Sequence, residues 1–309
     1  MTTILYAGNP EDWADYAKYV PAALKPMGIN ATMVQSCPPQ QVDYIVFSPT
    51  GPVSDFTLYP NLKAVLSLWA GVEKIIENKT LQVPLTRMVD DGLRQGMQEW
   101  VTGHVLRHHL GMDTHILNQD GIWRHSPPPL AQQRTIGILG IGELGQACAK
   151  SLRFLNFNVM GWSRTIKDID GIDCYSGVNG LNDILARSDI LVLLLPQTPE
   201  TKHIINADTL AKLPKDAVII NPGRGPLIDD NALIAALDSG HIQHATLDVF
   251  NTEPLPPSHP FWAHPQVTVT PHIASDTRSI TAAKVIATNI YRCETGQELL
   301  YQVNKTAQY

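Results

Sequence analysis

The chain has 309 residues, which is enough for about two domains. Hydrophobic residues make up 44% of it and charged residues 17%, a composition that is ordinary for a globular protein and excludes a disordered chain. Lysine and arginine number 23 against 29 aspartates and glutamates, which gives a formal net charge of −6. Because no basic excess is available to neutralise a phosphate backbone, we expect no binding to nucleic acid.

The four cysteines are scattered and form neither a CxxC pair nor a Cys/His cluster with zinc spacing. Isolated thiols are typical of a reducing compartment, and we expect no bound metal. The first residues lack the basic segment of a signal peptide, and the longest apolar run, residues 190–196, is too short to span a bilayer. The sequence therefore predicts a cytoplasmic protein with no membrane partner.

Short apolar runs alternate with segments of helical spacing through the first hundred residues. One such helical segment contains Trp13, Tyr16, Val20 and Leu24. Alternation of this kind predicts a parallel sheet with helical crossovers. The predicted strands are residues 3–7, 31–34, 44–47, 64–68 and 83–88.

The rest of the chain repeats this alternation after one long helix. That helix is predicted over residues 95–118, and prolines at 127, 128 and 129 then interrupt regular structure. Six further strands are enough for a full doubly wound sheet, and a last helix is predicted from residue 277 to about 295, where Gly296 supplies a stop. The predicted strands are residues 135–139, 158–162, 190–194, 217–220, 245–249 and 267–270.

A glycine-rich loop follows the first of these six strands. Gly140, Gly142 and Gly145 form a G-x-G-x-x-G pattern between a β-branched strand and a segment that favours helix. The first glycine permits a tight turn, the second lets the backbone approach a pyrophosphate, and the third lets the helix pack on the strand. A glycine-rich turn without a ligand is the alternative, but the context favours dinucleotide binding.

The end of the next strand indicates which dinucleotide binds. An NAD site usually places a carboxylate there for the ribose 2′-hydroxyl, but this chain has Ser163, Arg164 and Thr165 instead. Hydroxyls and a guanidinium suit a 2′-phosphate, so the sequence favours NADP(H), with NAD(H) as a possible second cofactor. The alternative is that Arg164 is only a solvated loop charge.

Three more polar residues follow later strands of the same predicted sheet. Arg224 has the chemistry to hold a carboxylate bidentately and to polarise a carbonyl, although it would equally cap a turn or pair with Asp229. His272 with Glu253 would give an oriented, protonated imidazole, the proton donor that carbonyl reduction needs. Each residue alone is more often structural. Their shared position after strands, downstream of a dinucleotide loop, predicts a catalytic group.

Ordered motifs through the chain support this hypothesis, and they resemble the D-isomer-specific 2-hydroxyacid dehydrogenases. Segments at residues 68–72, 97–100, 162–165 and 251–257 resemble the glyoxylate/hydroxypyruvate reductase A group within that family. This chain departs from the family pattern at Pro222 and Gly223, because the two positions before the arginine are more commonly a pair of small residues in the family. The family motifs are the three glycines, Leu193 to Thr201 (LLLPQTPET), Asn221 to Gly225 (NPGRG), Leu247 to Pro254 (LDVFNTEP) and Pro271 to Ala274 (PHIA).

The resemblance implies two doubly wound parallel-sheet α/β domains: a Rossmann dinucleotide-binding domain, residues 98–272, and a smaller flavodoxin-like substrate domain, residues 1–97 plus 273–309. It implies that His272 is the general acid, that Glu253 orients it and that Arg224 binds the 2-oxo acid. It also implies a homodimer. The implied substrate-binding residues are Trp69, Ala70, Gly71, Arg224 and His272. The implied cofactor-binding residues are Gly140, Gly142, Glu143, Leu144, Gly145, Ser163, Arg164, Thr165, Leu195, Pro196, Thr201, Pro222, Gly223, Asp248 and Ala274, with Asp248 at the nicotinamide carboxamide.

The expected activity is NADPH-dependent reduction of small 2-oxo acids, glyoxylate to glycolate and hydroxypyruvate to D-glycerate, by hydride transfer with a histidine general acid. Bulkier acids such as phenylpyruvate are an alternative, because the shape of the pocket depends on loops that the sequence does not place. Trp69 would narrow the pocket or stack on the substrate, and the alternative is that it packs in its own loop. A non-catalytic dinucleotide-sensing regulator is another alternative. A formate-type dehydrogenase is disfavoured because that group pairs its histidine with glutamine. In relatives, an aromatic residue from the region that corresponds to Trp123 can reach the active site of the other subunit of the dimer.

Overall fold

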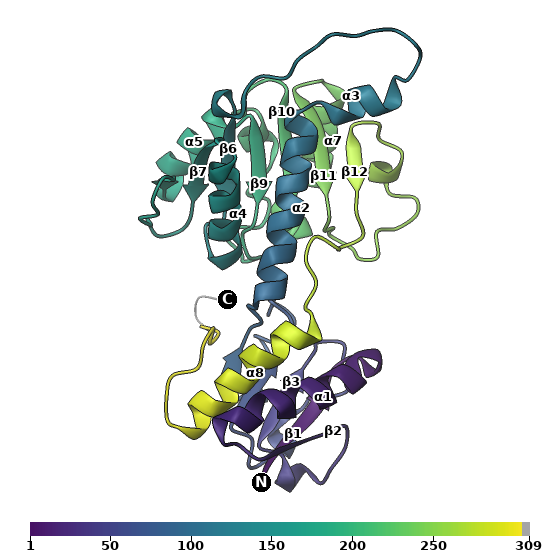
Figure 1. Ribbon diagram of the computed structural model, residues 1–309. Helices are drawn as coiled ribbons and strands as arrows, with labels where there is room; N and C mark the ends of the chain where they lie inside the picture. The colour runs from purple at the N-terminus through teal and green to yellow at the C-terminus, as the bar shows by residue number, and fades with distance from the viewer. Residues whose placement is uncertain (305–309) are drawn as a thin grey trace. The chain divides into compact units, whose positions relative to one another are not determined.

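The computed structural model describes residues 1–304, which divide into two compact units (Figure 1). Unit 1 comprises residues 1–93 and the C-terminal segment from residue 276, and unit 2 comprises residues 94–275. The sequence analysis placed the corresponding boundaries after residues 97 and 272. Each unit has a parallel sheet and its own hydrophobic core.

Unit 1 is a five-stranded parallel sheet in the order β2-β1-β3-β4-β5. Helices α1 (Trp13–Leu24) and α8 (Ser279–Glu294) pack against each other on one face of it (Figure 1). The central strands are buried on both sides, which explains their continuous apolar sequences. The strands are β1 (Thr2–Ala7), β2 (Ala31–Val34), β3 (Tyr44–Phe47), β4 (Ala64–Ser67) and β5 (Leu85–Thr86).

Unit 2 is a seven-stranded parallel sheet in the order β12-β11-β10-β9-β6-β7-β8, with helices on both faces. The strand order reverses at β6, and ligands of such sheets bind beyond the carboxyl ends of the strands at this point. This confirms the predicted fold class of two doubly wound parallel α/β sheets. The strands are β6 (Thr135–Leu139), β7 (Asn158–Trp162), β8 (Asp173–Tyr175), β9 (Ile190–Leu193), β10 (Ala217–Asn221), β11 (Ile242–Leu247) and β12 (Val267–Val269).

The two faces of the unit 2 sheet are covered by different helices. Alternate strand residues pack against α5, α6 and α7 on one face and against α2 and α4 on the other. The helices are α2 (Asp91–His109), α3 (Met112–Leu117), α4 (Glu143–Phe154), α5 (Gly177–Arg187), α6 (Ala207–Leu210) and α7 (Asp230–Asp238). Short 3₁₀ turns lie at Pro10–Asp12, Lys25–Met27, Pro39–Gln41, Phe56–Leu58, Ala131–Gln133, Gly225–Leu227 and Pro260–Trp262.

Two predicted strands differ in their bounds: the strand predicted over residues 83–88 is only β5, and the one predicted over residues 245–249 is β11, which begins and ends earlier. Two further elements differ in kind from the sequence prediction. The single helix predicted over residues 95–118 is wrong: α2 ends at His109, and α3 begins at Met112. Gly111 between them has φ +61°, a left-handed conformation that ends a helix and that glycine adopts without steric cost. The edge strand β8 was not predicted, because it is only three residues long and no residue of it is fully buried.

A cluster of histidines lies between α2 and strands β11 and β12. His108 Nε2 is 2.9 Å from the Thr246 hydroxyl, and His244 Nε2 is 2.9 Å from the Thr268 hydroxyl. The two imidazole rings have centroids 5.0 Å apart. Arg107 also donates a hydrogen bond to Thr268, at 2.9 Å. The Thr268 hydroxyl thus accepts from the guanidinium and forms a second hydrogen bond with the His244 imidazole.

Burial controls the charge of these imidazoles. It lowers the pKa of His108 to about 3, and the neighbouring His244 and Arg107 lower it further in the same direction. Burial, followed by the charge of Arg107, lowers the pKa of His244 to about 4. The pKa of His104, one turn before His108 on α2, is also lowered, again mainly by burial. The cluster is therefore neutral at physiological pH.

Candidate active site

The glycine loop lies between the ends of two strands. The Gly140 N–H donates to the Trp162 carbonyl at the end of β7, at 2.9 Å. On its other side Gly140, with φ +108°, lies against the chain after β9: a Cβ here would be 2.4 Å from the carbonyl carbon of Leu194. Any side chain at Gly140 would therefore disrupt the loop.

The other two glycines of the loop have very different surroundings, and the contact of Gly142 with a pyrophosphate stays a prediction. A Cβ on Gly145 would lie 1.9 Å from the Gly140 carbonyl oxygen, so helix α4 packs directly on the loop. Nothing lies within 4 Å of a Cβ on Gly142, and no side chain caps the start of α4 there. The loop is thus an open cradle of backbone N–H groups at a helix N-terminus, which fits a pyrophosphate. Glu143 and Leu144 form the first turn of α4.

The segment after β7 presents polar groups at the surface. The Ser163 N–H donates to the Tyr175 carbonyl at 3.1 Å, and its hydroxyl donates to the Thr165 carbonyl at 2.8 Å. Arg164 and Thr165 are exposed. The Thr198 hydroxyl and, as the smallest contribution, the Arg164 guanidinium hold the pKa of Glu200 below its usual range. Because β7 and β9 both pair in parallel with β6, Arg164 follows its strand at the same end of the sheet as the turn after β9.

That turn after β9 is fixed by threonine hydrogen bonds. The Thr201 hydroxyl donates to the Pro196 carbonyl at 2.7 Å and accepts the Thr198 N–H at 2.8 Å. Leu195 is buried and Pro196 is half-buried, next to the glycine loop. The predicted cofactor residues of the glycine loop and of the β9 turn thus form one continuous edge of unit 2.

Arg224 is held in a tight loop after β10. The buried side chain of Asn221 donates from Nδ2 to the Arg224 carbonyl at 2.9 Å and accepts the Gly223 N–H at 3.1 Å. The guanidinium donates from Nη1 to the Gly223 carbonyl at 2.7 Å. A Cβ on Gly223 would lie 2.7 Å from the Leu193 carbonyl oxygen, which explains why glycine follows Pro222 here.

The next residue joins this loop to the loop that carries Glu253. A Cβ on Gly225 would lie 2.0 Å from the carbonyl carbon of Phe250, so the two backbones are in direct contact. The Phe250 N–H in turn donates to Glu253 Oε1 at 2.9 Å. The loops that carry Arg224 and Glu253 are therefore in contact through Gly225 and Phe250.

Glu253 and His272 form the pair that the sequence predicted. His272 Nδ1 lies 2.8 Å from Glu253 Oε2, with the two side chains 50% and 36% exposed. With Nδ1–H donating to the carboxylate, Nε2 is the nitrogen that is available to an external group. The carboxylate uses its second oxygen on Phe250 and is thus fixed in orientation. A protonated His272 in this pair can donate a proton from Nε2 to a substrate oxygen.

The backbone of His272 is unusual. Its φ of +54° lies in the left-handed region, which costs a residue with a side chain on the order of 1 kcal/mol. Its N–H donates to the Asp248 carbonyl at 2.8 Å and to the Thr270 carbonyl at 3.0 Å. Strain of this kind persists only where neighbouring contacts hold the residue, and it is common at functional sites.

Asp248 supplies most of those contacts. Its side chain is fully buried and accepts three hydrogen bonds, from the Thr270 hydroxyl at 2.6 Å, the Ile273 N–H at 2.9 Å and the Ala274 N–H at 2.8 Å. Sequence reasoning placed Asp248 and Ala274 at the cofactor, and that contact stays a prediction. Thr270 was not predicted as a site residue, because no local sequence pattern indicates which hydroxyl donates to a buried carboxylate.

The predicted substrate loop at residues 69–71 lies in unit 1, directly after β4. The Trp69 N–H donates to the Ser67 hydroxyl at 3.1 Å, and its carbonyl accepts the Met88 N–H at 2.9 Å. Lys74 Nζ lies 5.6 Å from the centroid of the Trp69 ring, within cation–π distance. Ala70 and Gly71 are half-buried.

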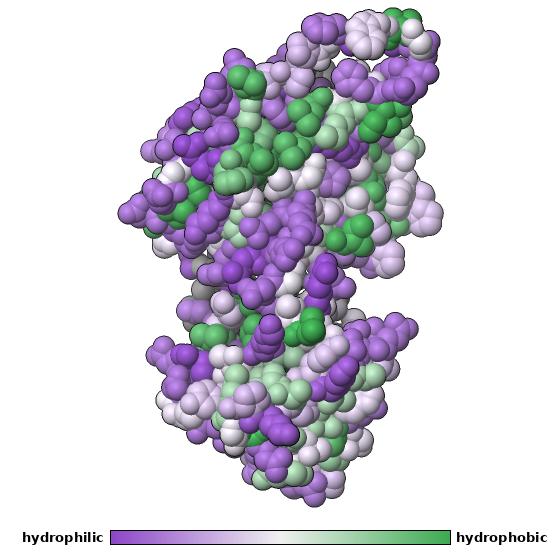
Figure 2. Space-filling view, in the orientation of Figure 1, coloured by the Kyte–Doolittle hydropathy of each residue, from purple (hydrophilic) through white to green (hydrophobic). Residues whose placement is uncertain are grey.

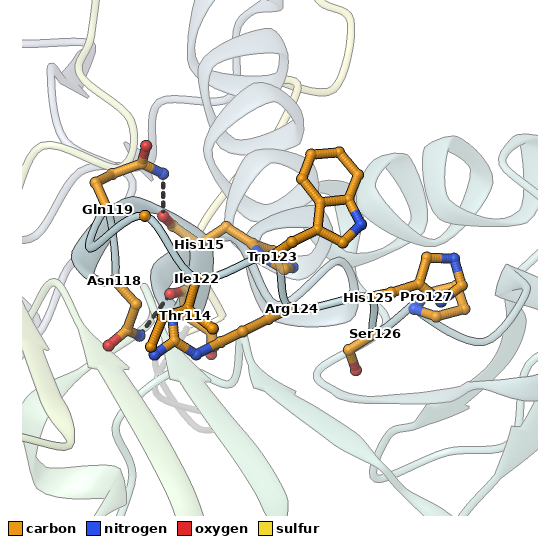
Figure 3. A pocket seen from close by; sticks show the side chains of 11 residues that line it. Thr114, His115, Asn118, Gln119, Ile122, Trp123, Arg124, His125, Ser126 and Pro127 are labelled. Atoms are coloured by element: carbon orange, nitrogen blue, oxygen red, sulfur yellow. Dashed lines mark hydrogen bonds between the residues drawn. The ribbon is translucent and has the colours of Figure 1, made fainter.

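The loop after α3 encloses a shallow pocket of about 540 Å³, shown in Figure 3. It is built from residues 114–127, and none of the predicted catalytic or cofactor residues lines it. Trp123 in this loop is 93% exposed, and apolar side chains of α3 are exposed as well (Figure 2). The exposed apolar side chains of this region are Leu110, Met112, Ile116, Leu117, Ile122, Trp123 and Leu130.

Fold and site together define a doubly wound α/β oxidoreductase with a dinucleotide cradle and a histidine–glutamate pair. A family model described as D-isomer specific 2-hydroxyacid dehydrogenase, NAD binding domain, matches residues 102–274. The chain belongs to this family, which confirms the resemblance drawn from the motifs.

Named relatives and solved structures are similar along most of the chain. Glyoxylate/hydroxypyruvate reductase A of Serratia proteamaculans is 44% identical over 244 residues, 76% of this chain and 78% of that protein. A D-isomer specific 2-hydroxyacid dehydrogenase from Xanthobacter autotrophicus, solved with NADPH and MES, has a TM-score of 0.93 at 40% identity, covering 100% of this chain and 99% of its own. An NADPH-dependent glyoxylate/hydroxypyruvate reductase from Sinorhizobium meliloti, solved with NADP and sulfate, has a TM-score of 0.85 at 34% identity, with full coverage of both chains.

Proposed function

We propose that this protein is an NADPH-dependent reductase of small 2-oxo acids that converts glyoxylate to glycolate and hydroxypyruvate to D-glycerate. The observation that carries the proposal is the His272–Glu253 pair, together with the contact of the Glu253 loop at Phe250 with Gly225, the residue after Arg224. A guanidinium that binds an anion, beside an imidazole backed by a carboxylate, suits a substrate with a carbonyl next to a carboxylate. The names of the similar proteins support the same substrate class.

In this proposal the chain's own residues perform the acid and binding steps. Bound NADPH supplies the hydride for the carbonyl carbon. His272 donates the Nε2 proton to the carbonyl oxygen as that oxygen gains charge, and Glu253 stabilises the imidazolium before transfer through the 2.8 Å contact at Nδ1. Arg224 holds the 2-oxo acid and stabilises the charge that develops on the oxygen. The N–H groups of Ala70 and Gly71 bind the substrate carboxylate, as the family resemblance implies.

We propose NADP(H) as the preferred cofactor. The open cradle at Gly142 would hold the pyrophosphate, and the half-buried Ser163 with the exposed Arg164 and Thr165 would hold the 2′-phosphate. Two similar proteins were solved with NADPH or NADP. Arg164 would form charge-assisted hydrogen bonds that the 2′-hydroxyl of NADH cannot match.

We further propose that the protein is a cytoplasmic homodimer. The proposal rests on the exposed apolar side chains of α3 and of the Trp123 loop, which a second copy would cover. No helix among residues 1–304 is long and apolar enough to cross a membrane. Sedimentation of the purified protein tests the dimer, and a monomer at micromolar concentration contradicts it.

The proposed function is tested with a panel of 2-oxo acids, each assayed with NADPH and with NADH. We expect turnover of glyoxylate and hydroxypyruvate, with NADPH preferred. Arg224→Ala and His272→Ala should each lower kcat/KM at least about a thousandfold, whereas Arg292→Ala on helix α8 controls for loss of a cation. Clear preference for phenylpyruvate would redefine the substrate, and NADPH binding without turnover of any acid would indicate a regulator.

A further inference from the structure

The strained backbone of His272 is held from both sides by one buried side chain. The Asp248 carboxylate accepts the N–H groups of Ile273 and Ala274, which directly follow His272. Its third partner, Thr270, lies two residues before His272 and donates its hydroxyl to Oδ1 at 2.6 Å. Asp248 thus fixes both ends of a short segment with the histidine at its centre.

The Thr270 hydroxyl has a specific part in this arrangement. A fully buried carboxylate is stable only when its oxygens are hydrogen-bonded, and Oδ1 has Thr270 and the Ile273 N–H as its partners. Loss of the hydroxyl would leave Oδ1 with one donor in an environment without water. The carboxylate would then rotate or draw in water, and the segment that holds His272 would follow.

We propose that Thr270 is a positioning residue of the reaction, acting through Asp248 to hold the His272 imidazole against Glu253. This proposal rests on the proposed function, in which His272 is the proton donor. The path consists of three contacts: Thr270 to Asp248, Asp248 to the backbone on both sides of His272, and His272 to Glu253 at 2.8 Å. Displacement of a catalytic group by about 1 Å is enough to lower a rate by about a hundredfold.

Thr270→Val tests the hydroxyl, because valine keeps the shape and removes the donor. We expect kcat for glyoxylate at saturating NADPH to fall about ten- to a hundredfold. Thr270→Ser, which restores the hydroxyl, should recover most of kcat. Thr268→Val is the matched control, since Thr268 is bonded to Arg107 and His244 and not to Asp248.

A second measurement separates positioning from general damage to the fold. In a His272→Ala background no imidazole remains to be positioned, so adding Thr270→Val should lower the residual kcat by less than about twofold. An equal loss in both backgrounds, or an unchanged kcat in Thr270→Val alone, overturns the inference. If Thr270→Val does not fold, Thr270→Ala removes the same hydroxyl with less bulk and takes its place.

The same assays distinguish this inference from the proposed function. Wild-type protein that reduces no 2-oxo acid refutes the proposed function and the inference with it. Active wild-type protein with an insensitive Thr270→Val variant refutes the inference alone.

Discussion

The buried histidines between α2 and the sheet predict a loss of stability in mild acid. Burial lowers the pKa of His108 to about 3, from an ordinary value of 6.5 that the unfolded chain regains. As the pH falls below 6.5, the imidazole of residue 108 therefore becomes protonated in the unfolded chain but stays neutral in the folded protein. The free energy of unfolding then decreases until the pH reaches the pKa of the folded state. At pH 5 this one group destabilises the fold by about 2 kcal/mol relative to pH 8. His244 acts in the same direction.

Urea unfolding of wild type and His108→Gln at pH 8 and pH 5 measures this effect. Glutamine retains a hydrogen-bonding group toward Thr246 but does not titrate, so the variant should lose about 2 kcal/mol less than wild type between the two pH values. His125→Gln, in the exposed loop after α3, controls for removal of an imidazole. Equal losses in wild type and His108→Gln would refute the assignment of acid sensitivity to this cluster.

Three further substitutions test the site. Glu253→Gln removes the charge beside His272, and kcat for glyoxylate should fall about ten- to a hundredfold; an unchanged kcat would show that the carboxylate is dispensable. Arg164→Ala should raise the KM for NADPH at least about tenfold and leave the KM for NADH unchanged, and equal changes would argue against 2′-phosphate binding. Gly225→Ala would place a Cβ 2.0 Å from the Phe250 carbonyl carbon, so we expect a melting temperature lowered by several degrees together with loss of activity; a variant with wild-type properties would contradict the close approach.

The sequence predicted most of the fold because buried parallel strands have continuous apolar sequences. Strands such as β3 and β9 are buried at every position, so their apolar runs coincide with the observed elements. The glycine loop was predictable for a related reason. The close approaches of Gly140 and Gly145 to backbone atoms permit no other residue, and they leave a pattern in the sequence.

What the sequence did not reveal depends on contacts between distant segments. The break between α2 and α3 occurs at Gly111, where helical spacing continues on both sides and only the backbone angle shows the end. Strand β8 forms because β7 provides a pairing edge, and its own three residues carry little signal. Thr270 meets Asp248 because β11 and β12 pair in one particular register, which no local pattern encodes.

The candidate catalytic residues were predictable as a set but not as a geometry. Their positions after strands indicated that they share one edge of a sheet, as parallel strands require. The contact of Gly225 with Phe250, which joins the Arg224 loop to the Glu253 loop, emerges only from the structure. The contacts of these residues with cofactor and substrate stay predictions.

The two units have separate hydrophobic cores, and this has a consequence for how the protein can be changed. Arg224, Glu253 and His272 all belong to unit 2, whereas the loop at residues 69–71 belongs to unit 1, which has a separate core. Under the proposed function, substitutions in the Trp69 loop would change which acid is accepted without altering the core that holds His272. Substrate range would then diversify in unit 1 while the residues proposed for proton donation in unit 2 stay the same.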